Sequence, residues 1–340
     1  MSHGQESLDL PYGPLTEPNL GPANLGPEPG WTTWGRWWSP FVVAAISLIT
    51  FIVGSGLMLV LAFYVVHGQV DRRMLASSEA MMAVSSSRLG LVLLVAAPQM
   101  ALVLPSLIAA LLSPERIGRR LSLVRGHWPY WVWAAAAVVT PLVGWISSIA
   151  VGAFMEESEN LQMMSEIFRT HGETGFLIPL ALLIGATPAL CEELLFRGYI
   201  QTRLNTSFGV IAAILISSSL FAVFHMDPVH IVAVFPLGLY LGLISWRSGS
   251  LFPAMLGHFV NNTVSVVSVV LSPEADSDSI SPAMSQFLTV VLVLGATGLV
   301  SLIYAWKAYP MRALEEPDRA ELGNSGDSPI DPPEDGPVAV

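Results

Sequence analysis

Charged residues are scarce in this chain. Only 12% of its 340 residues are Asp, Glu, Lys or Arg, whereas 53% are hydrophobic. This composition, with its long uncharged runs, excludes an ordinary soluble globule and predicts a polytopic membrane protein. The formal net charge of −11 comes mostly from tails and loops, and it gives no reason to expect a nucleic-acid partner.

Cysteine is almost absent as well. The chain has one, Cys191, which excludes an internal disulfide. Arg197 is the only basic residue near it in the sequence, so we interpret Cys191 as a small apolar core residue and not as a nucleophile. The first thirty residues contain no apolar h-region, and we therefore expect no cleavable signal peptide.

The apolar runs are long enough to be helices that cross a bilayer, which takes about 20 residues each. They predict an all-α fold, a polytopic membrane helical bundle of about eight transmembrane helices. The expected spans are residues 41–66, 89–112, 128–154, 175–204, 208–225, 230–246, 251–271 and 287–306.

These runs divide the chain into five parts. We expect disordered tails at 1–40 and 310–340, the first rich in Pro, Gly and Asn and the second acidic and rich in Pro. Residues 41–170 hold the N-terminal spans and a basic linker, 171–272 hold the core with the polar motifs, and 273–309 hold the last loop and span. The first tail ends in a tryptophan cluster that is typical of a membrane interface, made of Trp31, Trp34, Trp37 and Trp38.

The basic residues predict the orientation. With eight spans, a cytoplasmic linker at 113–127 puts both termini in the cytoplasm, as the positive-inside rule favours. The linker arginines are Arg116, Arg119, Arg120 and Arg125, and the basic residues on the same side are Arg36, Arg197, Arg203, Arg247, Lys307, Arg312 and Arg319. The opposite side has most of the loop acids and only Arg72, Arg73, Arg88 and Arg169. We predict an integral membrane protein, in the plasma membrane if the host is bacterial.

Three charged residues interrupt the fourth apolar run. Residues 176–190 carry no charge, and Glu192, Glu193 and Arg197 then follow within six residues. Each would cost roughly 2.5–3.5 kcal/mol at the bilayer centre. Glu193 and Arg197 are four residues apart with the acid first, which predicts a structural ion pair on one helix face. Glu192 lies about 100° round the helix, without an intrahelical cation, and we assign it a chemical role.

Two further polar motifs lie in apolar runs. Phe221 and His225 form an F-x-x-x-H, and His258 and Asn262 form an H-x-x-x-N. The residues of each pair share a helix face. A single histidine in a membrane helix is as often a helix–helix hydrogen-bond partner, but polar groups on three helices should converge on one interior cavity. At about 1.5 Å per residue from the cytoplasmic end of each helix, His225 lies several ångströms further into the membrane than the other polar residues, unless its span starts deeper or tilts.

The order E-E-x-x-x-R, F-x-x-x-H and H-x-x-x-N on successive apolar helices resembles the CPBP family. This family comprises the CAAX prenyl endopeptidases of the Ras-converting type and their bacterial relatives, called the Abi or lysostaphin-resistance-like family. Residues 235–242 and 248–251 also resemble the family pattern, and the resemblance covers about 178–264. The first three spans and both tails match nothing specific.

The resemblance implies an intramembrane endopeptidase whose active site faces a cavity open toward the cytoplasm. In that site Glu192 and His225 would activate the attacking water. His258 and Asn262 would form the oxyanion hole. The partners that this activity implies are a membrane-associated protein or peptide substrate, prenylated or not, and the lipid bilayer.

The resemblance gives Glu193 and Arg197 a supporting role in the same site. A glutamate and two histidines would also suit zinc, but the sequence contains no H-E-x-x-H. The proposed side chains can also activate water and bind the oxyanion without a metal. We therefore expect no metal and no other cofactor, with zinc as the alternative.

Other functions fit the sequence less well. Gly54-Ser55-Gly56 mimics a serine elbow, but small residues are ordinary packing devices in membrane helices. No aspartate lies inside a span, which excludes an aspartyl dyad. The competing class is a catalytically inactive scaffold, an immunity factor or a transporter, although the chain lacks the internal repeat that transporters usually show. Glu192→Gln separates these classes, because a scaffold would tolerate it.

Overall fold

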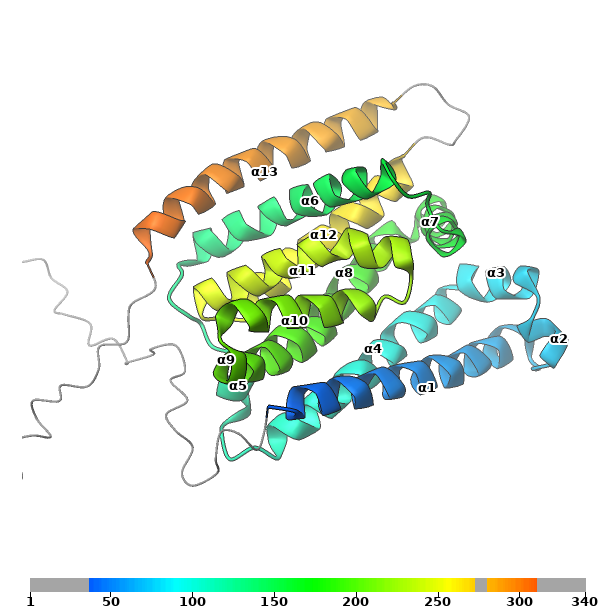
Figure 1. The fold of residues 1–340 in the computed structure, drawn as a ribbon. Helices are drawn as coiled ribbons and strands as arrows, with labels where there is room; N and C mark the ends of the chain where they lie inside the picture. Colours follow the sequence, from blue (N-terminus) through cyan, green and yellow to red (C-terminus); the bar gives the residue numbers. More distant parts are fainter. Residues whose placement is uncertain (1–36, 273–279, 311–340) are drawn as a thin grey trace, which may run out of the picture. The chain divides into compact units, whose positions relative to one another are not determined.

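The computed structural model describes residues 37–272 and 280–310, and every regular element in these residues is a helix. The expected all-α membrane bundle is thus confirmed. The apolar helices lie side by side and alternate in direction (Figure 1). They are α1 (Ser39–His67), α4 (Arg88–Leu111), α6 (Tyr130–Gly152), α8 (Leu177–Glu193), α10 (Val210–Val223), α11 (Pro228–Ser248), α12 (Phe252–Leu271) and α13 (Pro282–Ala308).

Helix α10 is the short member of this set. Seven helices in the described residues are long and apolar enough to cross a membrane, with the stretch from Glu159 to Phe208 taken as one, and α10 is not among them. Its 14 residues span about 21 Å at 1.5 Å per residue, against about 30 Å of hydrocarbon. The span expected at 208–225 is shorter because Gly209 and Met226, with φ of 77° and 54°, turn the chain at its two ends.

The loops between the spans contain helices that the hydrophobic pattern does not predict. These are α2 (Arg72–Leu75), α3 (Ser78–Ser86), α5 (Ile117–Arg120) and α7 (Glu159–His171). Helix α7 buries Phe168 and His171. Its N-cap, Ser158, accepts a hydrogen bond from the backbone N–H of Leu161. The Ser158 hydroxyl and the backbone N–H of His230 hold the pKa of Asp227 below its usual range, which ties the turn before α11 to α7.

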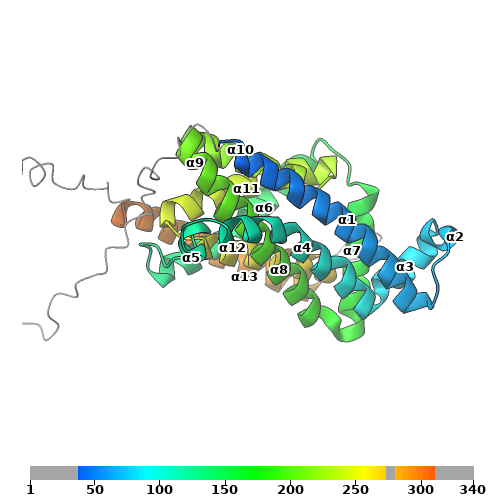
Figure 2. The same cartoon turned by 90° about the horizontal axis from the view of Figure 1, so that it is seen from below.

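The fourth predicted span is a helix with changes of winding. Gly175 has a φ of 74° and separates α7 from α8 within the π-helical segment η2 (Gly172–Phe176). Directly after Glu193 the chain winds as a second π-helical segment, η3 (Leu194–Gln201), and continues into α9 (Thr202–Phe208). Such wide turns inside α-helices are frequent at functional sites. Helix α8 packs against both α4 and α12 (Figures 1 and 2), and both glutamates at its end are buried.

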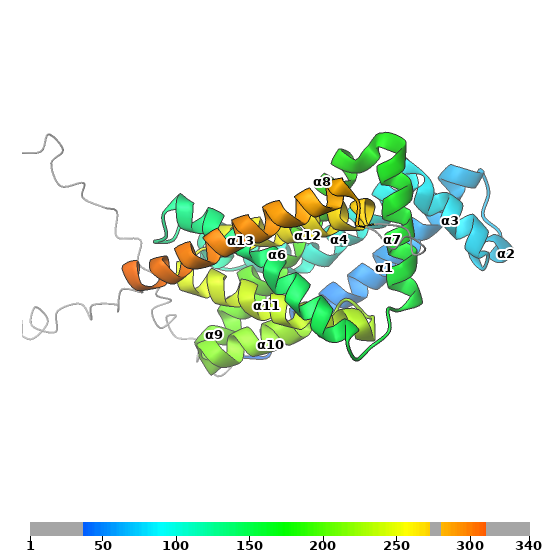
Figure 3. The same ribbon diagram turned by 90° about the horizontal axis from the view of Figure 1, so that it is seen from above.

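Helices α5 and α9, the start of α1 and the end of α13 lie at one end of the bundle, and α2, α3 and α7 lie at the other (Figures 1 and 3). Trp37 and Trp38 at the first end are 49% exposed each. The orientation across the membrane stays a prediction. The proposed tail structures, Trp31 and Trp34, and the acidic residues of the last loop lie outside the described residues.

Candidate active site

The site is built around the buried carboxylates at the end of α8. Glu193 is fully buried and Glu192 is 8% exposed. Arg197, one turn later in η3, is also fully buried and donates from Nη1 to Glu193 Oε1 at 2.8 Å. The ion pair predicted from the spacing is therefore confirmed. Loss of one partner would leave an uncompensated buried charge, which typically costs about 3–5 kcal/mol.

Close helix packing gives Arg197 two more contacts. Its Nη2 atom donates to the Gly238 carbonyl of α11 at 3.0 Å. Its guanidinium lies 4.3 Å from the centre of the Phe221 ring on α10, a cation–π contact. A Cβ atom at residue 238 would lie 3.1 Å from a carbon of the Phe221 ring, so the glycine permits this approach.

His258 of α12 stands beside both carboxylates. Its Nδ1 atom lies 2.9 Å from Glu193 Oε1, and its Nε2 atom lies 4.0 Å from Glu192 Oε2. Since an ionised carboxylate only accepts hydrogen bonds, Nδ1 is the protonated nitrogen in the contact with Glu193. Nε2 is then a hydrogen-bond acceptor in neutral His258 and a donor in the imidazolium form.

Gln99 of α4 is a member of the site that the sequence motifs do not include. Its side-chain amide donates to Glu192 Oε1 at 2.8 Å. The sequence contains a signal for it, because Gln99 is the one amide in an apolar run in which the other polar side chain is Ser106. Helix α4 therefore takes part in the site, although the first three spans carry none of the motifs.

His225 contacts the cluster through an aromatic ring. It follows the C-cap of α10 and is half-buried, and its Nδ1 atom lies 3.0 Å from the Phe221 carbonyl oxygen. The Phe221 ring centre lies 5.1 Å from the His225 ring centre and 5.8 Å from that of His258. His225 also lies 4.5 Å from His230, ring to ring. Phe221 thus connects the two catalytic candidates.

Asn262 contacts the backbone of α8 and not the carboxylates. Its side-chain amide donates to the Ile184 carbonyl at 3.2 Å, and its Oδ1 atom accepts from the Asn261 amide at 3.1 Å. Ile184 would normally accept from the N–H four residues later, but that residue is Pro188, which has none. Asn262 therefore satisfies a carbonyl that a proline leaves unpaired, and it keeps one amide hydrogen for another partner.

The arrangement can accept a proton at a defined atom. Glu192 Oε2 and Glu193 Oε2 are buried, and no residue that the structure describes forms a hydrogen bond with either. Glu192 Oε2 and His258 Nε2 are 4.0 Å apart, so one water molecule can lie within hydrogen-bond distance, about 2.8 Å, of both atoms. Within residues 37–272 and 280–310, three or more His, Cys, Asp or Glu side chains nowhere group as a metal site requires.

A comparison with known protein families matches the segment that carries the site residues other than Gln99. Residues 174–264 match the family model described as type II CAAX prenyl endopeptidase Rce1-like. This match confirms the family resemblance that the motifs give at 178–264. No curated protein and no solved structure matches the chain. Seven helices in the described residues are long and apolar enough to cross a membrane, so the chain is an integral membrane protein.

Proposed function

We propose that this chain, with its type II CAAX prenyl endopeptidase segment at 174–264, is an intramembrane endopeptidase. The observation that carries the proposal is the placement of Glu192. Its carboxylate is buried, and its Oε2 atom has no hydrogen-bond partner in the described part of the chain and lies 4.0 Å from His258 Nε2. A carboxylate so placed can take a proton from a water molecule held beside it.

Glu192 acts as the general base in this reaction. The water oxygen attacks the carbonyl carbon of the scissile peptide bond and forms a C–O bond, while one water proton passes to Glu192 Oε2. The carbonyl oxygen becomes the oxyanion of a tetrahedral intermediate. The proton then passes from Glu192 to the amide nitrogen as the C–N bond breaks, which releases a carboxylic acid and an amine.

His225 helps Glu192 to activate this water. The Phe221 carbonyl can only accept, so its contact with His225 assigns the proton to Nδ1. The Nε2 atom of the neutral ring is then an acceptor for a water proton. The contacts of the Phe221 ring with both histidines support a place for His225 beside the cluster.

His258 and Asn262 bind the oxyanion. Glu193 fixes the His258 ring through Nδ1, so Nε2 faces the space beside Glu192 and donates there when the ring is an imidazolium. Asn262 contributes the amide hydrogen that it does not use on Ile184. A donor of this kind contributes on the order of 3–4 kcal/mol to the transition state. Arg197 holds Glu193 and so supports His258.

The substrate is a membrane-associated protein or peptide. The matched family model names CAAX prenyl endopeptidases; for this chain we propose the wider class, which includes unprenylated peptides. The proposed orientation has both termini in the cytoplasm, because the arginine-rich linker and α9 lie at one end of the bundle. The membrane is the plasma membrane if the host is bacterial.

The proposal is tested by comparing membrane proteins from cells that produce the wild-type chain or the Glu192→Gln variant at equal levels. New protein termini should appear with the wild type and be absent with the variant. Glu166→Gln is the matched control, since it makes the same change at an exposed position of α7. If wild type and Glu192→Gln give the same set of termini, the chain is a scaffold of this fold and not a protease.

A further inference from the structure

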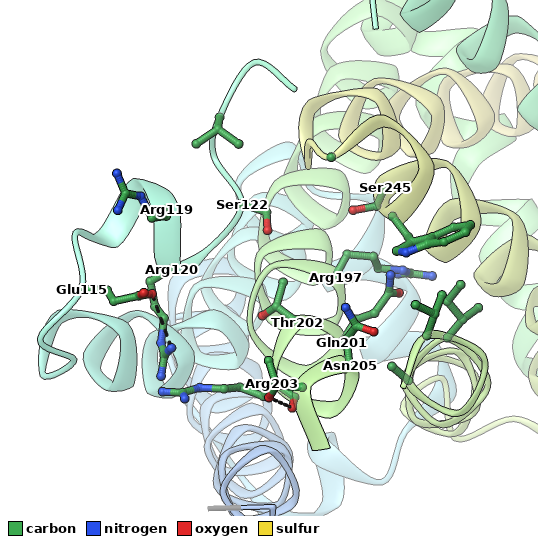
Figure 4. A pocket seen from close by; sticks show the side chains of 17 residues that line it. Glu115, Arg119, Arg120, Ser122, Arg197, Gln201, Thr202, Arg203, Asn205 and Ser245 are labelled. Carbon is green, nitrogen blue, oxygen red and sulfur yellow. Dashed lines mark hydrogen bonds and ion pairs between the residues drawn. The ribbon is translucent and has the colours of Figure 1, made fainter. Parts of the chain in front are cut away.

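A second polar site lies at the end of the bundle that carries α5 and α9. A cavity of about 150 Å³ opens there between α5, α9, α10 and the end of α11 (Figure 4). Arg197 reaches its lining, but that side chain is already paired with Glu193. The groups that give this cavity its own chemistry are therefore those of α5 and α9.

These groups are predominantly cationic. Arg119, Arg120 and Arg203 line the cavity with one carboxylate, Glu115, whose Oε2 atom lies 3.6 Å from Arg120 Nη1. In the view of Figure 4 the Arg203 side chain extends from α9 toward that of Arg120. The Arg203 Nε atom is buried and has no hydrogen-bond acceptor among the residues that the structure describes. An excess of arginine over carboxylate around one cavity favours an anionic ligand.

Aromatic and apolar residues near the cavity are of the kinds that lie at a membrane interface. Trp37, a half-exposed residue of the kind that marks the interface, packs edge-on against Phe208 at the end of α9, with the ring centres 6.3 Å apart. Val210 and Ile214 of α10 form an apolar wall of the cavity. Ile211 on the same helix is 77% exposed. Cationic and apolar surfaces thus meet at the depth where lipid head groups lie.

We propose that this cavity binds the phosphate group of an anionic phospholipid, with the acyl chains along the exposed apolar face of α10. Arginine forks match phosphate oxygens in geometry and charge, and basic pockets between membrane helices bind lipid head groups. A free phosphate ion offers the same charge, but it would leave the apolar surface of α10 without a partner.

The test measures the binding of three soluble probes to the full-length protein in a neutral detergent, by thermal unfolding and native mass spectrometry. The probes are dioctanoyl phosphatidylglycerol, dioctanoyl phosphatidylcholine and inorganic phosphate. The variant Arg119→Gln/Arg203→Gln keeps the buried Arg120 and its contact with Glu115. The control Arg116→Gln/Arg125→Gln removes the same amount of charge from the linker that carries Arg119, outside the cavity lining. Arg119→Gln alone, at an exposed position, replaces the double variant if that variant does not fold.

Phosphatidylglycerol should bind and raise the unfolding temperature, whereas phosphatidylcholine and phosphate should bind at least tenfold more weakly. Each cavity arginine should contribute about fivefold, so the double variant should bind phosphatidylglycerol about 25-fold more weakly and the control should match the wild type. Equal losses in variant and control would mean attraction to surface charge alone and would overturn the proposal. Phosphate binding as tightly as the lipid would also overturn it.

Discussion

Gln99 of α4 connects Glu192, the proposed catalytic base, to a helix outside the matched family segment. Its side-chain amide donates a hydrogen bond to Glu192 Oε1, which leaves Oε2 available to a water molecule. A hydrogen bond to a charged group contributes about 1.5–3 kcal/mol. Because the bond fixes the direction of the base, its loss should affect turnover more than substrate binding.

We therefore predict that Gln99→Leu lowers kcat by about tenfold to a hundredfold with KM almost unchanged. Steady-state cleavage of a membrane peptide by the purified protein measures both constants. Ser106→Ala is the control, since Ser106 is a buried polar residue of the same helix whose hydroxyl donates to the Val103 carbonyl. Equal kcat values for Gln99→Leu and the wild type would remove Gln99 from the site.

We predict that Arg197 has a structural role. The fold should tolerate the loss of Arg197 only when its ion-pair partner Glu193 is removed as well. Arg197→Met should destabilise the fold by about 3–5 kcal/mol, because it leaves Glu193 buried and unpaired. The double variant Glu193→Leu/Arg197→Met should recover most of the stability and none of the activity, since His258 loses its acceptor. Thermal unfolding and cleavage are measured on the same preparations. A wild-type unfolding temperature in Arg197→Met would instead give Arg197 a role in substrate binding.

At the scale of the helices, α8 and α12 are joined by a proline and an asparagine that lie far apart in the sequence. Pro188 removes the N–H that Ile184 would use, and Asn262 replaces it. The same bond fixes the direction of the Asn262 amide. The predicted catalytic residue therefore has a structural task as well, and a single substitution cannot separate the two.

A double-mutant cycle separates them. Asn262→Ala should destabilise the native protein by about 1–3 kcal/mol, because the Ile184 carbonyl stays unpaired. In a Pro188→Ala background the N–H of residue 188 can donate to the Ile184 carbonyl. The destabilisation by Asn262→Ala should then fall below about 0.5 kcal/mol. Activity should drop by about 10²–10³ in both backgrounds if Asn262 binds the oxyanion. Recovery of activity together with stability would show that Asn262 acts only on the helix.

Over the whole molecule, the sequence predicts the features that follow from the spacing of residues along one helix and from the free-energy cost of polar groups in lipid. The apolar runs give the helices, and the four-residue spacing gives the Glu193–Arg197 pair. Contacts between helices are not encoded in this way, because they depend on which faces meet. Gln99, the Phe221 ring between two histidines and the bond from Asn262 to α8 belong to this class. The hydrophobic pattern also overestimates the length of α10, because Gly209 and Met226 turn the chain on either side of it with positive φ.

The membrane orientation can be tested with single cysteines in a Cys191→Ala background. Ser207 on α9 and Gln69 after α1 are exposed and lie at opposite ends of the bundle. A membrane-impermeant thiol reagent added to intact cells should label Gln69→Cys and spare Ser207→Cys, and inverted vesicles should give the opposite pattern. Labelling of Ser207→Cys in intact cells would reverse the proposed topology.

The role of Glu192 is tested most directly by the cleavage rate of the purified protein in lipid nanodiscs, with one membrane peptide and three proteins. Wild type and Glu166→Gln should cleave at the same rate. Glu192→Gln, which keeps the shape of the side chain and should unfold near the wild-type temperature, should leave less than about one part in a thousand of that rate. Cleavage by Glu192→Gln at more than a few per cent of the wild-type rate would contradict the assignment of Glu192 as the base.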